Sequence, residues 1–131
     1  MTRWRWVAQA AALAIHDELL AQHGGPTGVR DPAMLESALA RPINLAAYGK
    51  PDVFDLAAAY AFGIARNHPF IDGNKRTAFV VAAVFLLDNR FELDASEEDA
   101  TLATYAMAEG QRTEQDYAAW LRARCIPFEG D

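Results

Sequence analysis

Apolar residues recur every three or four positions along most of the chain, a spacing that predicts amphipathic helices. The first predicted helix covers residues 7–23 and ends at a Gly-Gly-Pro sequence. The second begins after Asp31, which can cap its amino end, with Pro32 in the first helical position, and it continues to Arg41. The segment 42–51, bounded by two prolines, is then predicted to be a connection.

Four further helices are predicted in the remaining sequence. One covers residues 52–67, and another covers residues 74–89. Two more, over 96–110 and 113–124, each start at a hydroxyl residue placed three positions before an aspartate, the pattern of a capping box. The 74–89 helix is apolar nearly all round, which is typical of a helix at the centre of a bundle. We therefore expect an all-α fold, a compact six-helix bundle around a central apolar helix.

Composition agrees with a helical globule. The chain has 131 residues, the size of one ordinary domain, so that residues 1–131 are expected to form a single domain. Hydrophobic residues make up 52% of the sequence, and alanine, the strongest helix former, fills 27 positions. Internal repeats and linker-like stretches are absent from the sequence, so nothing indicates a second module.

Charge and cysteine content narrow the functional classes. A formal net charge of -6 disfavours direct nucleic-acid binding by general phosphate neutralisation. The longest apolar run has ten residues, whereas a membrane span needs about 20, so we expect no membrane association. The single Cys125 cannot form an internal disulfide, and the start of the chain does not resemble a signal peptide. These features favour a cytoplasmic protein.

One segment, between the third and fourth predicted helices, concentrates residues that suit phosphate chemistry. It consists of nine consecutive residues: His68, Pro69, Phe70, Ile71, Asp72, Gly73, Asn74, Lys75 and Arg76. Its end forms the first turn of a helix, where unpaired N–H groups and the helix dipole attract anions. Gly73 lets the backbone approach a phosphate closely, and Lys75 and Arg76 add two cations. These features predict a phosphate-binding site at the amino end of the 74–89 helix.

The other polar residues of the segment complete a candidate catalytic set. Asp72 can hold Mg²⁺, which commonly binds one or two carboxylates together with substrate phosphates and water. His68 has an ordinary pKa near 6.5, which suits a general base. Each residue alone has a structural explanation, since Asp72 could cap the helix and the cations could form a solvated face. Cations at the positive end of a helix, however, cost about 0.3 to 1 kcal/mol each, and a bound anion would offset that cost. Phe70 is expected to anchor the loop in the core.

The segment resembles the motif H-P-F-x-D/E-G-N-x-R of the Fic/Doc family. All seven specified positions are met, by His68, Pro69, Phe70, Asp72, Gly73, Asn74 and Arg76. Gly24-Gly25 and the stretches 28–31 and 64–67 are also similar to the Doc branch, and the resemblance covers roughly residues 15–127. It implies a compact helical fold and transfer of a phosphate-containing group from a nucleotide to a protein hydroxyl.

Two positions favour the Doc branch over the adenylyltransferases of the family. Those enzymes have glycine in place of Lys75 and a second arginine in place of Phe79, whereas Doc-type members resemble kinases that bind the nucleotide in the reversed sense. The resemblance then implies that His68 deprotonates a serine or threonine and that Asp72 holds Mg²⁺. It further implies that Gly73, Asn74, Lys75 and Arg76 bind phosphates of ATP or another nucleoside triphosphate. Arg66 could equally reach phosphate or pair with a carboxylate such as Asp72.

The resemblance also implies a biological role and partners. Doc relatives resemble toxins that halt translation, with a threonine of elongation factor Tu as the implied target. Their restraint would come from a small antitoxin whose C-terminal helix lies in a groove. Two alternatives stay open at this point: a protein adenylyltransferase, and a catalytically idle protein that keeps the fold only for binding.

Overall fold

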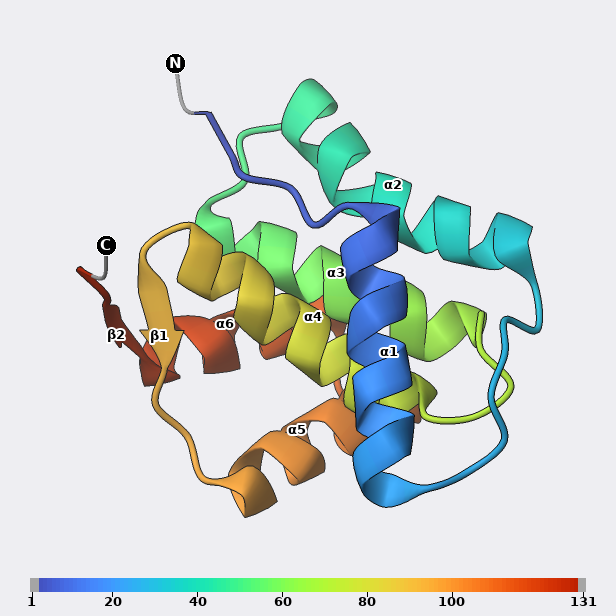
Figure 1. Cartoon of the computed structure of the whole chain (residues 1–131). Coiled ribbons are helices and arrows are strands. Elements are labelled where there is room, and N and C mark those ends of the chain that lie inside the picture. The colour runs from blue at the N-terminus through green and yellow to red at the C-terminus, as the bar shows by residue number, and fades with distance from the viewer. Residues whose placement is uncertain (1–2, 130–131) are drawn as a thin grey trace.

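The computed structural model describes residues 3–129, and its elements follow one another as shown in Figure 1. They are α1 (Gln9–His23), α2 (Pro32–Tyr48), α3 (Val53–Asn67), α4 (Asn74–Asp88), β1 (Phe91–Leu93), α5 (Glu97–Ala108), α6 (Glu114–Arg124) and β2 (Cys125–Pro127). The expected six-helix architecture is confirmed. Within the described part of the chain, the helices are not long and apolar enough to cross a membrane.

Local capping explains where four of the helices begin. Side chains of the residues just before α2, α3, α5 and α6 accept hydrogen bonds from first-turn N–H groups, as predicted; these residues are Asp31, Asp52, Ser96 and Thr113. The caps of α3 and α6 are reciprocal capping boxes with Asp55 and Asp116. The helix α4 differs, since it begins at Gly73 in the left-handed conformation, with φ at 79°, and has no side-chain cap.

The second helix is longer than predicted. The sequence interpretation made 42–51 a connection, but α2 continues through Pro42 to Tyr48, and only residues 49–52 join it to α3. A proline inside a helix removes one hydrogen bond and crowds the preceding turn. Here Pro42 is buried on the same face as Leu35, Ala38 and Leu39, along the side of α2 that packs on α3. Tertiary packing therefore overrides the local tendency of proline to end the helix.

The all-α expectation was wrong in one detail. Strands β1 and β2 form a small antiparallel sheet in which Glu92 is opposite Ile126. Each strand has only three residues, too few for an alternating pattern to be visible in the sequence. The pairing joins the chain after α4 to the chain after α6, and Phe91 packs edge-on against Phe54 of α3 at 5.0 Å between ring centroids.

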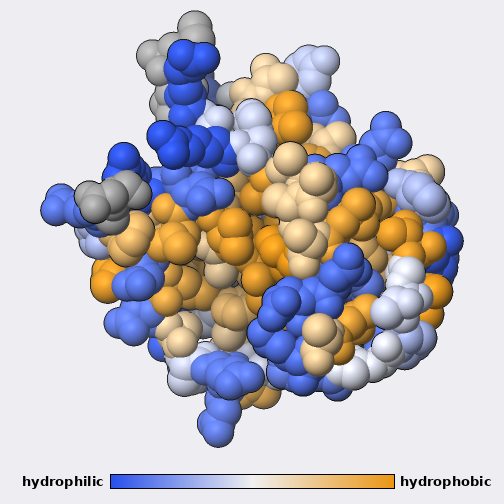
Figure 2. Space-filling view, in the orientation of Figure 1, coloured by the Kyte–Doolittle hydropathy of each residue, from blue (hydrophilic) through white to orange (hydrophobic). Residues whose placement is uncertain are grey.

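The most deeply buried helix is α3 rather than α4. Residues 56–61 of α3 are all buried, and this helix packs against α2, α4, α5 and α6. The helix α4 packs on α3 and is flanked by α1 and α5, but its outer side is only partly covered. Phe79, Val80 and Val84 are half-buried, and Leu87 is 41% exposed. The apolar surface of this region is visible in Figure 2. An all-round apolar pattern thus reflects both burial and an open apolar strip.

Candidate active site

The segment 68–73 is a tight loop whose conformation is set by its buried residues. His68 ends α3 in the left-handed conformation, at φ 49° and ψ 55°, and its N–H donates to the carbonyl of Ile64. Phe70 is 1% exposed, which confirms it as the anchor of the loop. The chain then returns to the surface at Ile71 and Asp72 before Gly73 starts α4.

The side chain of Asn74 closes this loop onto α4. Its Oδ1 accepts a hydrogen bond from the N–H of Phe70, and its Nδ2 donates to the carbonyl of the same residue, both at 2.9 Å. Nδ2 also lies 3.4 Å from Nδ1 of His68, too long a contact to fix the tautomer of that ring. Since the amide of Asn74 is occupied by the backbone of Phe70, its contribution to a phosphate site would come from its main-chain N–H.

A pocket of about 400 Å³ opens at the amino end of α4. Six of the seven residues proposed from the sequence line it together with Ile71 and Tyr105: His68, Asp72, Gly73, Asn74, Lys75 and Arg76. The structure does not bring Arg66 to this pocket. Its guanidinium lies over the ring of Phe62, 5.4 Å from the centroid, and its side chain is exposed.

The pocket is electrostatically suited to an anion. The N–H groups at the start of α4 have no partner inside the helix, and its N-terminal residue supplies no side-chain cap. Lys75 lies over the ring of Tyr105 at 4.5 Å and 3.8 Å from a carboxylate oxygen of Glu109, and Arg76 is exposed beside it. The helix dipole adds positive potential at the same place. A phosphate would compensate all of these charges at once.

Sequence reasoning missed the residue that supports the loop from below. His16 of α1 is 2% exposed, and its Nε2 donates a hydrogen bond to the carbonyl of Asp72 at 2.8 Å. Its ring also stacks on Phe70, with centroids 3.8 Å apart and an interplanar angle of 8°. The available signal was its position, because His16 falls between Ala12 and Leu20 on the buried stripe of α1. It was read only as a residue on a helix face.

A second unpredicted clamp comes from the segment that precedes α2. Arg30 donates from Nε to the carbonyl of His68 at 2.7 Å and from Nη2 to that of Asn67 at 2.9 Å. The main chain of the same segment bonds to the loop, from Arg30 N–H to the Pro69 carbonyl and from Ile71 N–H to the Gly28 carbonyl. The guanidinium thus sits at the negative end of α3, where a cation is favourable, and holds the backbone of His68.

The carboxylate of Asp72 lies against the backbone of Gly25. A Cβ atom at Gly25, where φ is +119°, would stand 2.5 Å from Oδ2 of Asp72, so no other residue fits without displacing the carboxylate. One exposed carboxylate beside a phosphate site is a donor set that fits Mg²⁺, which takes its remaining ligands from phosphate oxygens and water. Residues 3–129 contain no cluster of three or more acidic, histidine or cysteine side chains that would hold a metal ion by themselves.

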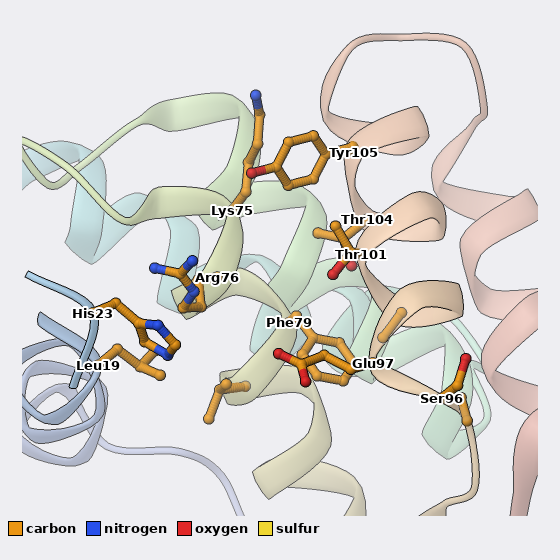
Figure 3. Close-up of a pocket in the computed structure, with 13 residues that line it drawn as sticks. Leu19, His23, Lys75, Arg76, Phe79, Ser96, Glu97, Thr101, Thr104 and Tyr105 are labelled. Atoms are coloured by element: carbon orange, nitrogen blue, oxygen red, sulfur yellow. The ribbon is translucent and has the colours of Figure 1, made fainter.

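A neighbouring pocket of about 390 Å³ continues from the first (Figure 3). It lies between the end of α1, the outer side of α4 and the inner side of α5, and shares Lys75, Arg76 and Tyr105 with the first pocket. Thr101 and Glu97 of α5 line it on one side, as Figure 3 shows. The site is therefore a two-chambered cleft.

Comparison with known proteins agrees with this geometry. The model of the Fic/DOC family matches residues 6–86, which include α1 to α4 and the whole loop. The chain is 34% identical over 119 residues to a protein named Protein kinase doc from Escherichia phage P1, an alignment that covers 90% of this chain and 94% of that protein. It is 45% identical over 75 residues to Toxin Doc from Mycolicibacterium smegmatis, covering 55% and 57% of the two chains. With its helical fold, its complete motif and these matches, the chain belongs to the Fic/Doc family.

Proposed function

We propose that this protein transfers the terminal phosphate of a nucleoside triphosphate such as ATP to a serine or threonine hydroxyl of a target protein. The observation that carries the proposal is the pocket at the uncapped start of α4, which brings together His68, Asp72, Lys75 and Arg76. The relative from phage P1 is named a protein kinase, which supports the same reaction. Lysine at position 75 fits it too, because the resemblance associates glycine there with the adenylyltransferases.

Each group of the pocket has a role in this reaction. His68 accepts the proton of the target hydroxyl, whose oxygen then bonds to the γ-phosphorus while the bond from phosphorus to the bridging β-oxygen breaks. The nucleoside diphosphate leaves with the electron pair of that bond. N–H groups at the start of α4, with Lys75 and Arg76, stabilise the negative charge on the phosphate oxygens. Mg²⁺, held by Asp72 and the nucleotide, would neutralise further charge.

The reaction is tested by the mass of the modified target. Purified protein is incubated with ATP, Mg²⁺ and a candidate target, for which we propose elongation factor Tu modified at a threonine. A mass increase of one phosphate unit with the native chain and none with His68→Ala is the expected result. An increase of one AMP unit would show an adenylyltransferase instead. Absence of any modification, with ATP binding intact, would contradict this target.

We also propose that the protein acts as a toxin in the cytoplasm, halts translation through this target and is restrained by a small antitoxin whose helix lies in a groove. The name of the Mycolicibacterium relative, Toxin Doc, supports this role. Induced expression of the native chain alone should arrest bacterial growth, and His68→Ala should not. Co-expression of the small protein encoded beside it should restore growth. Normal growth with the native chain expressed alone would contradict the toxin role.

A further inference from the structure

We propose that the second pocket, between α4 and α5, holds the base and ribose of the nucleotide whose phosphates lie at the start of α4. This inference rests on the proposed function and adds to it an orientation of the nucleotide and the residues that contact its nucleoside part.

Continuity between the two pockets is the first argument. Both are lined by Lys75, Arg76 and Tyr105, so a ligand anchored by its phosphates in one extends directly into the other. Their volumes, about 400 and 390 Å³, each fall in the range of small-molecule sites, roughly 300–1,000 Å³. The phosphate chamber alone offers a nucleoside mostly charged side chains and polar backbone.

Charge along the cleft sets the direction of the ligand. The contact of Lys75 with Tyr105 fixes one end, and Glu97 lies two turns before Tyr105 on α5, about 12 Å away along the helix axis. In Figure 3, Glu97 lies beside Phe79, one turn beyond Lys75 on α4. A phosphate is repelled by the carboxylate of Glu97, whereas ribose hydroxyls can donate hydrogen bonds to it. The anionic tail therefore belongs at the Lys75 end and the ribose toward Glu97.

The walls of the second pocket suit a planar base. Leu19, Phe79, Val80 and Ala100 supply apolar surface from three helices, and the ring of Phe79 is half-buried. Aromatic and aliphatic side chains of this kind stack on the face of a base without selecting its identity. The hydroxyl of Thr104 is bonded to that of Tyr117, which leaves Thr101 as the exposed hydroxyl on this wall.

Blocking the pocket tests the assignment. Thr101→Trp places a large side chain at an exposed position that lines this pocket and not the phosphate pocket. Calorimetry with Mg²⁺ should show a dissociation constant for ATP raised at least about tenfold, while that for inorganic tripolyphosphate stays the same. Leu102→Trp, at the next position on α5 and 70% exposed, does not line either pocket and should bind both ligands as the native chain does.

The ribose contact has its own test. Glu97→Gln should reduce the preference for ATP over 2′,3′-dideoxy-ATP, because the neutral amide accepts hydrogen bonds from the hydroxyls less strongly. Glu98→Gln removes a neighbouring charge outside both pockets and should keep that preference.

The outcomes separate this inference from the proposed function. If the native chain binds ATP and Thr101→Trp binds it equally well, the nucleoside lies elsewhere and the inference is wrong while the function stands. An unchanged preference in Glu97→Gln would likewise overturn the orientation. If the native chain binds neither ATP nor tripolyphosphate, the proposed function itself fails.

Discussion

His16 donates a hydrogen bond from its buried imidazole to the carbonyl of Asp72, 2.8 Å away and 56 residues later in the chain. The same ring stacks on Phe70, so one side chain of α1 contacts both the anchor of the loop and the residue assigned to the metal. With a carbonyl as acceptor, Nε2 must carry the proton. The first helix is therefore part of the apparatus that shapes the active-site loop, although it supplies no residue to the phosphate pocket.

Replacing His16 should impair catalysis more than nucleotide binding. His16→Ala removes both contacts, and displacement of Asp72 should lower kcat for phosphate transfer about 10- to 100-fold, with a smaller change in KM for ATP. His16→Gln can still donate to the carbonyl but cannot stack, and should give an intermediate kcat. Thermal unfolding should show both variants folded. A native kcat in His16→Ala would contradict the positioning role.

Substitution of Gly25 should displace the carboxylate of Asp72. Both Gly25→Ala and Gly24→Ala place a side chain at positive φ, which costs about 1–2 kcal/mol, but only at Gly25 would the new Cβ meet Asp72. We expect the two variants to lose similar stability, measured by urea unfolding. Gly25→Ala alone should weaken Mg²⁺-dependent ATP binding, measured by calorimetry. Equal ATP binding by the two variants would show that the contact with Asp72 has no functional weight.

Loss of the Arg30 side chain should loosen the loop without removing any pocket residue. Arg30→Met deletes the hydrogen bonds to the carbonyls of His68 and Asn67. Because the arginine is exposed, we expect a loss of only about 1 kcal/mol in unfolding free energy. Hydrogen exchange of amides in residues 68–73 should become faster. The matched variant Arg112→Met, on the exposed turn before α6, should leave those amides unchanged, and the same protection in both variants would contradict the clamp.

Cys125 should react slowly with alkylating reagents. Burial raises the pKa of its thiol from 9.0 to about 11, which lowers the thiolate fraction at pH 8 about 100-fold. Since the neutral thiol is favoured by the folded state, alkylation by iodoacetamide should be far slower in the native protein than in urea. Its rate should rise with pH up to about 11. A native rate equal to that in urea would mean that the strand β2 does not shield the thiol.

Several features of this protein follow from the sequence because they depend on neighbouring residues. The caps at Asp52 and Thr113 are local, since each bonds to a backbone group three residues away. The phosphate site is likewise predictable, because its motif is contiguous and the start of a helix attracts anions whatever surrounds it. For the same reason, Asn74 and Phe70 appear together in the motif and meet in the structure through hydrogen bonds four residues apart.

Other features were decided only by the packing of distant segments. The continuation of α2 through Pro42, the pairing of β1 with β2 and the open side of α4 depend on which surfaces the helices bury against one another. His16 and Arg30 reach the loop from 56 and 38 residues away, and Gly25 matters only because Asp72 comes to lie against it. Helical periodicity specifies which face of each helix is apolar, but not which neighbour covers that face. The sequence alone therefore identified the reacting groups, and the tertiary structure supplied the residues that hold them in place.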